Sequence, residues 1–146
     1  MPSYQKTQQV KGKRKKSKTQ SNRKKLIKEL DDLIRQIIKK RDSKCFTCGS
    51  DVEDIGYFSK ENPLGLQVGH YVGRKKYALR WNLKNVHAQC TFCNGKHRFD
   101  ELPYTVALAE KYGKGIFKEF MYLRENHKSL NLGDLRDIKS ELEKMV

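Results

Sequence analysis

The chain has 146 residues, of which 34% are charged and 36% are hydrophobic, and its formal net charge is +15 at pH 7. This length fits a single domain. A core with so few hydrophobic residues is expected to need a staple, that is, a cross-link such as disulfide bonds or a bound metal. No apolar run approaches the roughly 20 residues of a membrane span, and no signal peptide is visible. We therefore expect a protein of a reducing compartment, without a membrane role.

The N-terminal segment carries most of the net charge. Residues 1–28 contain eleven Lys or Arg residues and no acid, whereas the remainder has 21 basic and 17 acidic residues. Residues 1–22 lack the apolar content needed to fold, so we expect a disordered tail. A solubilising tail is one interpretation. The favoured one is an arm that neutralises DNA phosphates through residues such as Lys13, Arg14, Lys15 and Lys16.

The middle of the chain is expected to form a zinc-stapled core over residues 23–100. Apolar residues spaced three and four apart predict a helix from Arg23 to Asp42, capped by Ser21 or Asn22. A loop follows over residues 50–65. Leu66 to Val72 is expected to be a strand, Gly73 to Lys76 a basic turn, and Ala78 to Val86 a returning strand or extended segment. With a helix beginning near Asn94, the order is ββα.

Residues 101–146 are expected to be helical. Pro103 suits a helix start and Gly113 a helix end. Further apolar stripes run from Ile116 to Leu123 and from Asn131 to Val146. They could be part of the core or a dimer face, and the pattern leaves both open. The predicted fold class is α+β and mostly helical, with a leading helix, a small ββα core and C-terminal helices.

All four cysteines lie in two Cys-x-x-Cys pairs, and this spacing predicts a structural zinc site. The pairs are Cys45–Cys48 and Cys90–Cys93. Disulfide bonds are the alternative, but paired Cys-x-x-Cys motifs in a reducing compartment favour metal. Zinc held by four thiolates has no open coordination position, so it cannot activate water.

His70, which lies between the two pairs, is the candidate for acid–base chemistry. Its unperturbed pKa near 6.5 suits a general base that deprotonates water near neutral pH, and a backbone carbonyl bonded to one ring nitrogen would fix its tautomer. Attack on a phosphodiester also needs a divalent cation, for which Mg²⁺ or Mn²⁺ is expected. The side-chain oxygen of Asn94, at the start of the last ββα helix, would serve as a ligand.

These residues resemble a known family. Gly69-His70-Tyr71, Leu79 to Leu83, and Asn85 to Asn94 are similar to the phage recombination protein NinG family, also called Rap, which belongs to the HNH or ββα-metal nucleases. The resemblance runs from about Cys45 to Gly113. The Cys-x-x-Cys-Asn ending is also similar to phage endonuclease VII, a Holliday-junction resolvase of the same superfamily.

The resemblance implies roles for individual residues. His70 matches the general base, Asn94 the ligand of the catalytic cation, and Asn85 an asparagine that braces the loop between the strands. Many HNH enzymes place a metal-binding aspartate before the base histidine, where this chain has Gly69. His87 is then the candidate for the second ligand. Backbone contacts to DNA are expected from Arg74, Lys75, Lys76 and Arg80, which flank the proposed base.

The function implied is a metal-dependent endonuclease of phage recombination that cleaves branched DNA such as Holliday junctions or D-loops, in the cytoplasm of the bacterial host. Symmetric cutting of a junction implies a homodimer. Recombinase or single-strand-binding proteins are possible partners. Two alternatives stay open: an HNH enzyme that cuts ordinary duplex DNA, and a non-catalytic zinc protein that binds DNA and assists recombination.

Overall fold

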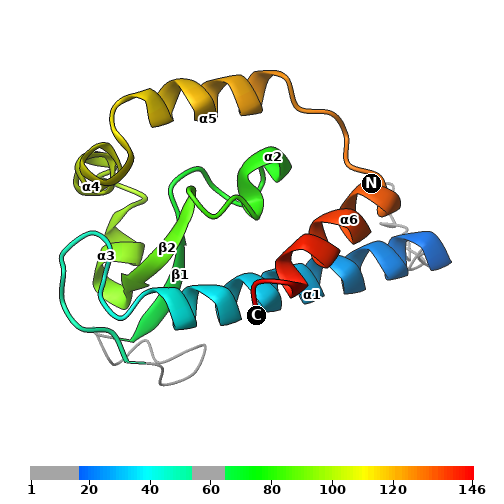
Figure 1. Cartoon of the computed structure of the whole chain (residues 1–146), viewed down its shortest axis with the longest axis horizontal. Coiled ribbons are helices and arrows are strands. Elements are labelled where there is room, and N and C mark those ends of the chain that lie inside the picture. Colours follow the sequence, from blue (N-terminus) through cyan, green and yellow to red (C-terminus); the bar gives the residue numbers. More distant parts are fainter. Residues whose placement is uncertain (1–16, 54–64) are drawn as a thin grey trace, which may run out of the picture.

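The computed structural model describes residues 17–53 and 65–146, so the tail candidates Lys13 to Lys16 lie outside the described residues. The predicted class is confirmed: the described chain is α+β and mostly helical, with one two-stranded sheet (Figure 1). Its elements are, in order, α1 (Lys18–Arg41), β1 (Leu66–His70), α2 (Tyr77–Arg80), β2 (Val86–Cys90), α3 (Thr91–Lys96), α4 (Leu102–Tyr112), α5 (Gly115–Glu125) and α6 (Leu132–Glu143).

Helix α1 begins earlier than predicted. It starts at Lys18 rather than Arg23, and its cap is Ser17, whose Oγ accepts a hydrogen bond from the Gln20 backbone N–H at 3.3 Å. Residues 18–22 include no Gly or Pro, so nothing in them stops the helix once Ser17 has capped it. The segment expected to be a disordered tail through residue 22 is therefore helical from Lys18 onward.

The sheet is an antiparallel pair in which Leu66 faces Cys90 and His70 faces Val86. The ββα order is confirmed, but the second strand was placed wrongly, because Tyr77–Arg80 forms the short helix α2 and the strand begins only at Val86. Every residue of β2 is buried. Its sequence alternates apolar residues with polar ones at positions 87 and 89, a pattern typical of a strand with one solvent-exposed face, so burial of the polar face is not predicted from the sequence.

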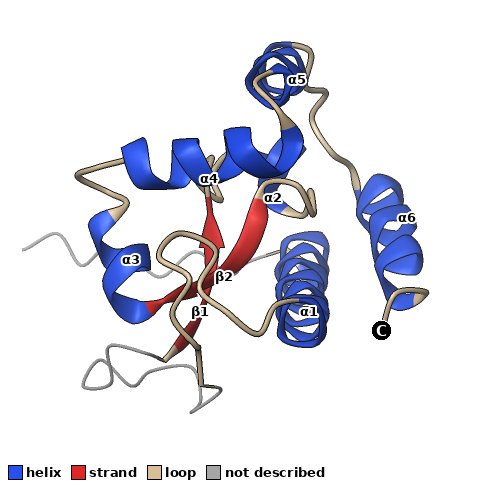
Figure 2. Ribbon diagram, turned by 60° about the vertical axis from the view of Figure 1, so that its left-hand side comes forward, coloured by secondary structure: helices blue, strands red, loops and turns tan. Residues whose placement is uncertain are grey.

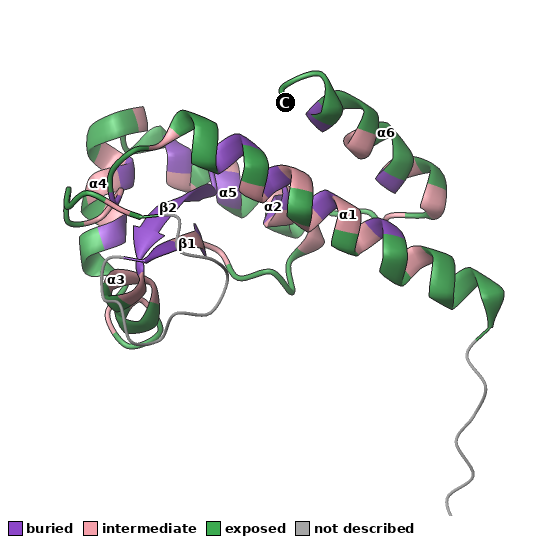
Figure 3. Cartoon of the chain, turned by 90° about the horizontal axis from the view of Figure 1, so that it is seen from below, coloured by how far each residue is buried: buried purple, intermediate pink, exposed green. Residues whose placement is uncertain are grey.

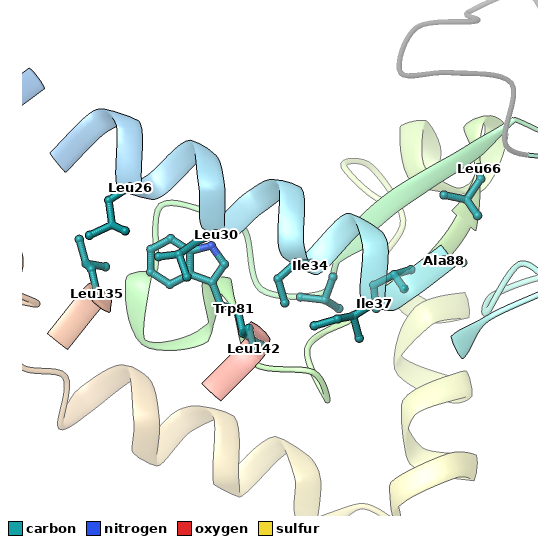
Figure 4. Close-up of a cluster of buried hydrophobic side chains, with 11 residues drawn as sticks. Leu26, Leu30, Ile34, Ile37, Leu66, Trp81, Ala88, Leu135 and Leu142 are labelled. Atoms are coloured by element: carbon teal, nitrogen blue, oxygen red, sulfur yellow. The ribbon is translucent and has the colours of Figure 1, made fainter. Parts of the chain in front are cut away.

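The main core lies along α1. Figure 2 shows α1 between the sheet and α6, and in Figure 4 Leu26 faces Leu135 of α6, whereas Ile34 and Ile37 lie toward Ala88 of the sheet. Buried residues from the other elements complete this cluster: Leu66, Trp81, Val86, Ala88, Leu135 and Leu142. The last helix therefore covers the first one and closes the core over the ββα unit.

A second cluster joins α2, α4 and α5 on the other side of the sheet. It contains Leu79, Tyr104, Leu108, Ile116 and Phe120. The apolar stripes of the C-terminal helices thus supply core residues, while other members stay exposed (Figure 3), namely Val106, Met121 and Met145. Within residues 17–53 and 65–146, no helix is both long and apolar enough to cross a membrane.

Candidate functional site

The four cysteines form one cluster. Their sulfur atoms all lie within 4.8 Å of one another, and the Cys48 and Cys90 sulfurs are 4.0 Å apart. Four sulfurs at about 2.3 Å from one tetrahedral zinc ion would be about 3.8 Å apart, so the spacing fits. All four cysteines are free of disulfide bonds, which argues against the disulfide alternative. The donor set is that of a closed structural zinc site.

Backbone hydrogen bonds position the two halves of this cluster. Gly49 adopts φ 74° and donates to the Cys45 carbonyl at 2.8 Å, which closes the knuckle after α1. Only glycine adopts this left-handed geometry at no steric cost. The Phe46 N–H donates to the Ala88 carbonyl at 2.8 Å, so the knuckle is tied to β2. The second pair follows directly, since β2 ends at Cys90 and α3 contains Cys93.

His70 ends β1 and is held by a backbone carbonyl. Its Nε2 lies 2.9 Å from the Arg80 carbonyl oxygen, which can only accept, so Nε2 carries the proton and Nδ1 keeps its lone pair in the neutral ring. Burial lowers the pKa of His70 to about 4, and the nearby Arg74 charge acts in the same direction, against the opposing effects of Asp31 and of the Arg80 and Val68 carbonyls. His70 is therefore a neutral, oriented base at pH 7.

The Asn85 side chain braces the segment that leads from β1 into α2. It is fully buried, and its Oδ1 accepts from the Val72 N–H at 2.8 Å. Its Nδ2 donates to the carbonyls of Val72 and Leu79, both at 3.0 Å. These bonds match the bracing expected of Asn85. It acts on the fold of the turn and does not line the cavity described next.

A cavity of about 750 Å³ brings His70 and Asn94 together. The walls come from α1, β1, the turn after β1 and α3 with its following turn. Its lining also includes four side chains that can carry positive charge, Arg35, Arg74, His97 and Arg98. Arg98 lies four residues after Asn94, a helical spacing that could have revealed it. Arg35 comes from α1, and no local pattern connects it with the site.

The four residues predicted to contact the DNA backbone differ in their exposure and partners. Arg74, Lys75 and Lys76 are exposed, as a contact to DNA requires. Arg80 does not fit that expectation, because its guanidinium makes a two-pronged ion pair with Asp31 of α1, with distances of 3.0 and 2.6 Å. Asp31 also accepts from the Trp81 indole N–H at 2.9 Å. Arg80 thus fixes α2 against α1 and presents its carbonyl to His70.

His87 was wrongly predicted as a second metal ligand. It is fully buried and stacks on Phe46, with ring centroids 3.7 Å apart. Its Nδ1 lies 3.1 Å from the Tyr104 hydroxyl and its Nε2 lies 3.0 Å from the Tyr112 hydroxyl. Burial lowers the pKa of His87 to about 3, so the ring is neutral. With both nitrogens bonded, His87 joins β2 to α4 and has no lone pair left for a cation.

Position 69 leaves no room for a side chain, because the side chain of Gln89 packs against it. A Cβ atom built on it would lie 2.0 Å from the side-chain oxygen Oε1 of Gln89 and 2.6 Å from its Cδ. Gln89 is fully buried, and its Nε2 donates to the Thr47 hydroxyl at 2.6 Å. A carboxylate at position 69 is therefore excluded unless Gln89 moves. The absence of the aspartate that many HNH enzymes place before the base histidine agrees with the packing of β1 against β2.

The fold and the cysteine cluster define a small, mostly helical α+β protein whose four cysteines could bind one zinc ion. The sequence model of the family described as Bacteriophage Lambda NinG protein matches residues 3–146, nearly the whole chain. The protein therefore belongs to this family. The match extends well beyond the segment from Cys45 to Gly113 that carries the resemblance. No curated protein and no solved structure matches the chain.

Zinc loading tests the cysteine cluster. We expect the purified protein to contain about one zinc ion per chain, and Cys48→Ser or Cys90→Ser to lose both the metal and the folded state, because structural zinc supplies folding free energy. Elemental analysis and circular dichroism measure the two effects. Ser50→Ala is the control, since it removes the hydroxyl 3.3 Å from the Cys48 sulfur and keeps all four thiolates. A folded protein without metal would contradict the assignment.

A double-mutant cycle tests the packing of Gly69 against Gln89. We expect Gly69→Ala to lower the free energy of unfolding by about 1–3 kcal/mol through overpacking, and the added Gln89→Ala to make the same change nearly harmless. Denaturant unfolding of the zinc-loaded protein gives these values. Gly73→Ala is the control, because a Cβ there meets nothing within 4 Å. Additive effects of the two substitutions would disprove the contact.

Proposed function

We propose that the protein is a metal-dependent DNA endonuclease of phage recombination with an HNH-type centre. The observation that carries the proposal is the state of His70, a neutral imidazole whose Nε2 is bonded to the Arg80 carbonyl and whose ring shares a cavity with Asn94. A purely structural role for His70 would not account for the 750 Å³ cavity beside it, which is lined by three arginine side chains. Family membership agrees with a recombination role.

In the proposed reaction, Nδ1 of His70 takes a proton from a water molecule, whose oxygen attacks the phosphorus of a phosphodiester. The P–O bond to the leaving sugar oxygen breaks, and that oxygen takes a proton from a second water molecule. A divalent cation such as Mg²⁺ or Mn²⁺ supplies Lewis-acid stabilisation of the charge that develops on the phosphate. The Asn94 amide oxygen is the candidate ligand, and the Glu101 carboxylate lines the same cavity. Because Mg²⁺ keeps several water ligands, one or two protein oxygens suffice to hold it beside DNA phosphate.

Cationic side chains around the cavity support a nucleic-acid substrate. Arg74 and Arg98 are exposed and line the cavity, and Lys75 and Lys76 extend the positive charge along the turn. Guanidinium groups bind phosphate in two-pronged fashion and so fix the backbone near the base. The basic residues of the first sixteen positions would add affinity that depends on salt.

The finer features of this proposal rest on the resemblance. They are a preference for branched DNA, action as a homodimer with one centre on each strand, and work beside recombinase or single-strand-binding proteins in the cytoplasm of an infected bacterium. The chemistry of the cavity is also compatible with cleavage of ordinary duplex DNA. Parallel assays on a four-way junction and on a linear duplex of the same sequence therefore belong to every test of the activity.

Replacement of His70 tests the general base. We expect His70→Ala to lower the cleavage rate at least about 100-fold while DNA binding persists, because the base acts only in the chemical step. Since burial keeps the pKa of His70 at about 4, beside Arg74 and Asp31, kcat/KM should stay flat from pH 7 to about pH 5 and fall as the imidazole gains its proton near pH 4.

The control for this assay is His127→Ala, which alters an exposed histidine after α5. Circular dichroism and zinc content at each pH separate loss of the base from loss of the fold. Full cleavage activity of His70→Ala would exclude His70 as the general base, whereas DNA binding without cleavage by the wild type at any metal concentration would leave the non-catalytic alternative. A break in the pH profile near 6.5 would contradict a desolvated base.

Replacement of Asn94 tests the proposed cation ligand. We expect Asn94→Ala to raise the Mg²⁺ or Mn²⁺ concentration at half-maximal cleavage by about tenfold or more, because the cation loses a protein ligand. The rate at saturating metal should recover in part. Asn126→Ala, at the exposed end of α5, is the control. An unchanged metal titration would exclude Asn94 as a ligand.

A further inference from the structure

The aromatic side chain of Phe99 stands out in the described part of the chain. It is 89% exposed, more than any other large hydrophobic side chain there. The backbone of its turn is anchored, because the N–H groups of Phe99 and Asp100 both donate to the Lys96 carbonyl, at 2.9 and 3.1 Å. His97, two residues earlier, donates from Nε2 to the Tyr71 carbonyl at 3.0 Å and so ties the turn to the end of β1.

This exposed ring lies on the cavity that contains the proposed base. Phe99 lines it together with His70 and Asn94, and its neighbour Arg98 lines it too. An exposed aromatic ring on an anchored turn, beside arginine side chains that line the same cavity, is a combination suited to unpaired nucleotides. Cations hold the backbone, while the ring offers a flat apolar face to a base.

We propose that Phe99 stacks on an unpaired base next to the phosphate that enters the cavity, and thereby selects branched or locally opened DNA. The inference rests on the proposed endonuclease function. In continuous duplex DNA both faces of each base are already stacked, so a ring gains such a contact only after unstacking a step. At a branch point or flap, an unpaired base has a free face, and stacking on it does not depend on sequence.

The surroundings favour a nucleotide over a second protein. Two further exposed apolar residues, Leu102 and Val106, lie on α4, but neither lines the cavity. Arg35, Arg74 and Arg98 do line it, and they complement a phosphate backbone. Two acids line the cavity: Asp31 is paired with Arg80, and the proposed cation would offset the charge of Glu101. Asp100, next to Phe99, is engaged by Lys96 at 3.9 Å and by the Leu102 N–H at 3.2 Å.

Binding measurements on the full chain test this inference separately from cleavage. The probe is a branched duplex with one unpaired 2-aminopurine at the branch point, compared with a linear duplex of the same sequence. The zinc-loaded protein is used without added Mg²⁺ or Mn²⁺ and without chelator, so that the DNA stays intact and the zinc stays bound. Fluorescence anisotropy gives affinity, and 2-aminopurine emission reports stacking of the unpaired base.

We expect Phe99→Ala and Phe99→Leu to weaken binding of the branched probe about tenfold, to leave the linear duplex unchanged and to alter the 2-aminopurine signal. Phe99→Trp should keep wild-type behaviour because it retains an aromatic face. Tyr122→Ala, which removes a 65% exposed ring from α5, and Leu102→Ala, which removes the 66% exposed neighbour, are matched controls. Both should bind like the wild type.

Three results would overturn the inference: wild-type binding by Phe99→Leu, equal weakening on branched and linear DNA, or a changed oligomeric state of Phe99→Ala in analytical ultracentrifugation. The last would assign the ring to a protein interface. If the wild type discriminates through Phe99 yet never cleaves DNA with metal, the endonuclease proposal fails and the stacking contact stands. If it cleaves and Phe99 has no effect, the opposite holds.

Discussion

The cysteine cluster is the constraint on which the rest of this structure depends. It joins a knuckle at the end of α1 to the junction of β2 and α3, 42 residues later in the chain for the Cys48–Cys90 pair. A sheet of two strands is marginal in water by itself, and a chain with only 36% hydrophobic residues has little core to add. Zinc held by four thiolates would supply that missing free energy. It would also fix α3 beside β1, which carries His70.

A polar network beside the cluster holds the proposed base in place. Asp31 of α1 binds the Arg80 guanidinium and the Trp81 indole, and the Arg80 carbonyl then faces the His70 ring. The side chain of Asn85 holds the intervening turn through hydrogen bonds to the backbone of Val72 and Leu79. Each of these groups has a hydrogen-bond partner, so the network stays ordered although it is partly buried. Arg80, which the sequence suggested as a contact to DNA, thus serves to orient the His70 imidazole.

The same packing explains why this site lacks the carboxylate that HNH enzymes often place before the base. Gln89 lies over Gly69, and the His87 ring is enclosed by Phe46, Tyr104 and Tyr112. A centre that relies on Asn94, on water ligands and on DNA phosphate would hold its cation weakly until DNA is bound. If the protein is the endonuclease proposed above, such weak binding would confine cleavage to correctly placed DNA.

Local patterns in the sequence determined the parts of this protein that depend on spacing alone. The two Cys-x-x-Cys pairs predicted the metal cluster, and apolar periodicity predicted α1 and the C-terminal helices. His70 was a candidate from its residue type, whereas the bracing role of Asn85 came from the family resemblance. Only the tertiary structure decided which candidates face one another. The Asp31–Arg80 pair spans 49 residues, and Arg35 reaches the cavity from another element. The polar residues of β2 are buried against the alternation of its sequence, and Gly69 is constrained by a side chain twenty residues away. Such contacts between distant segments leave no trace in local sequence, because packing brings them together only when the chain folds.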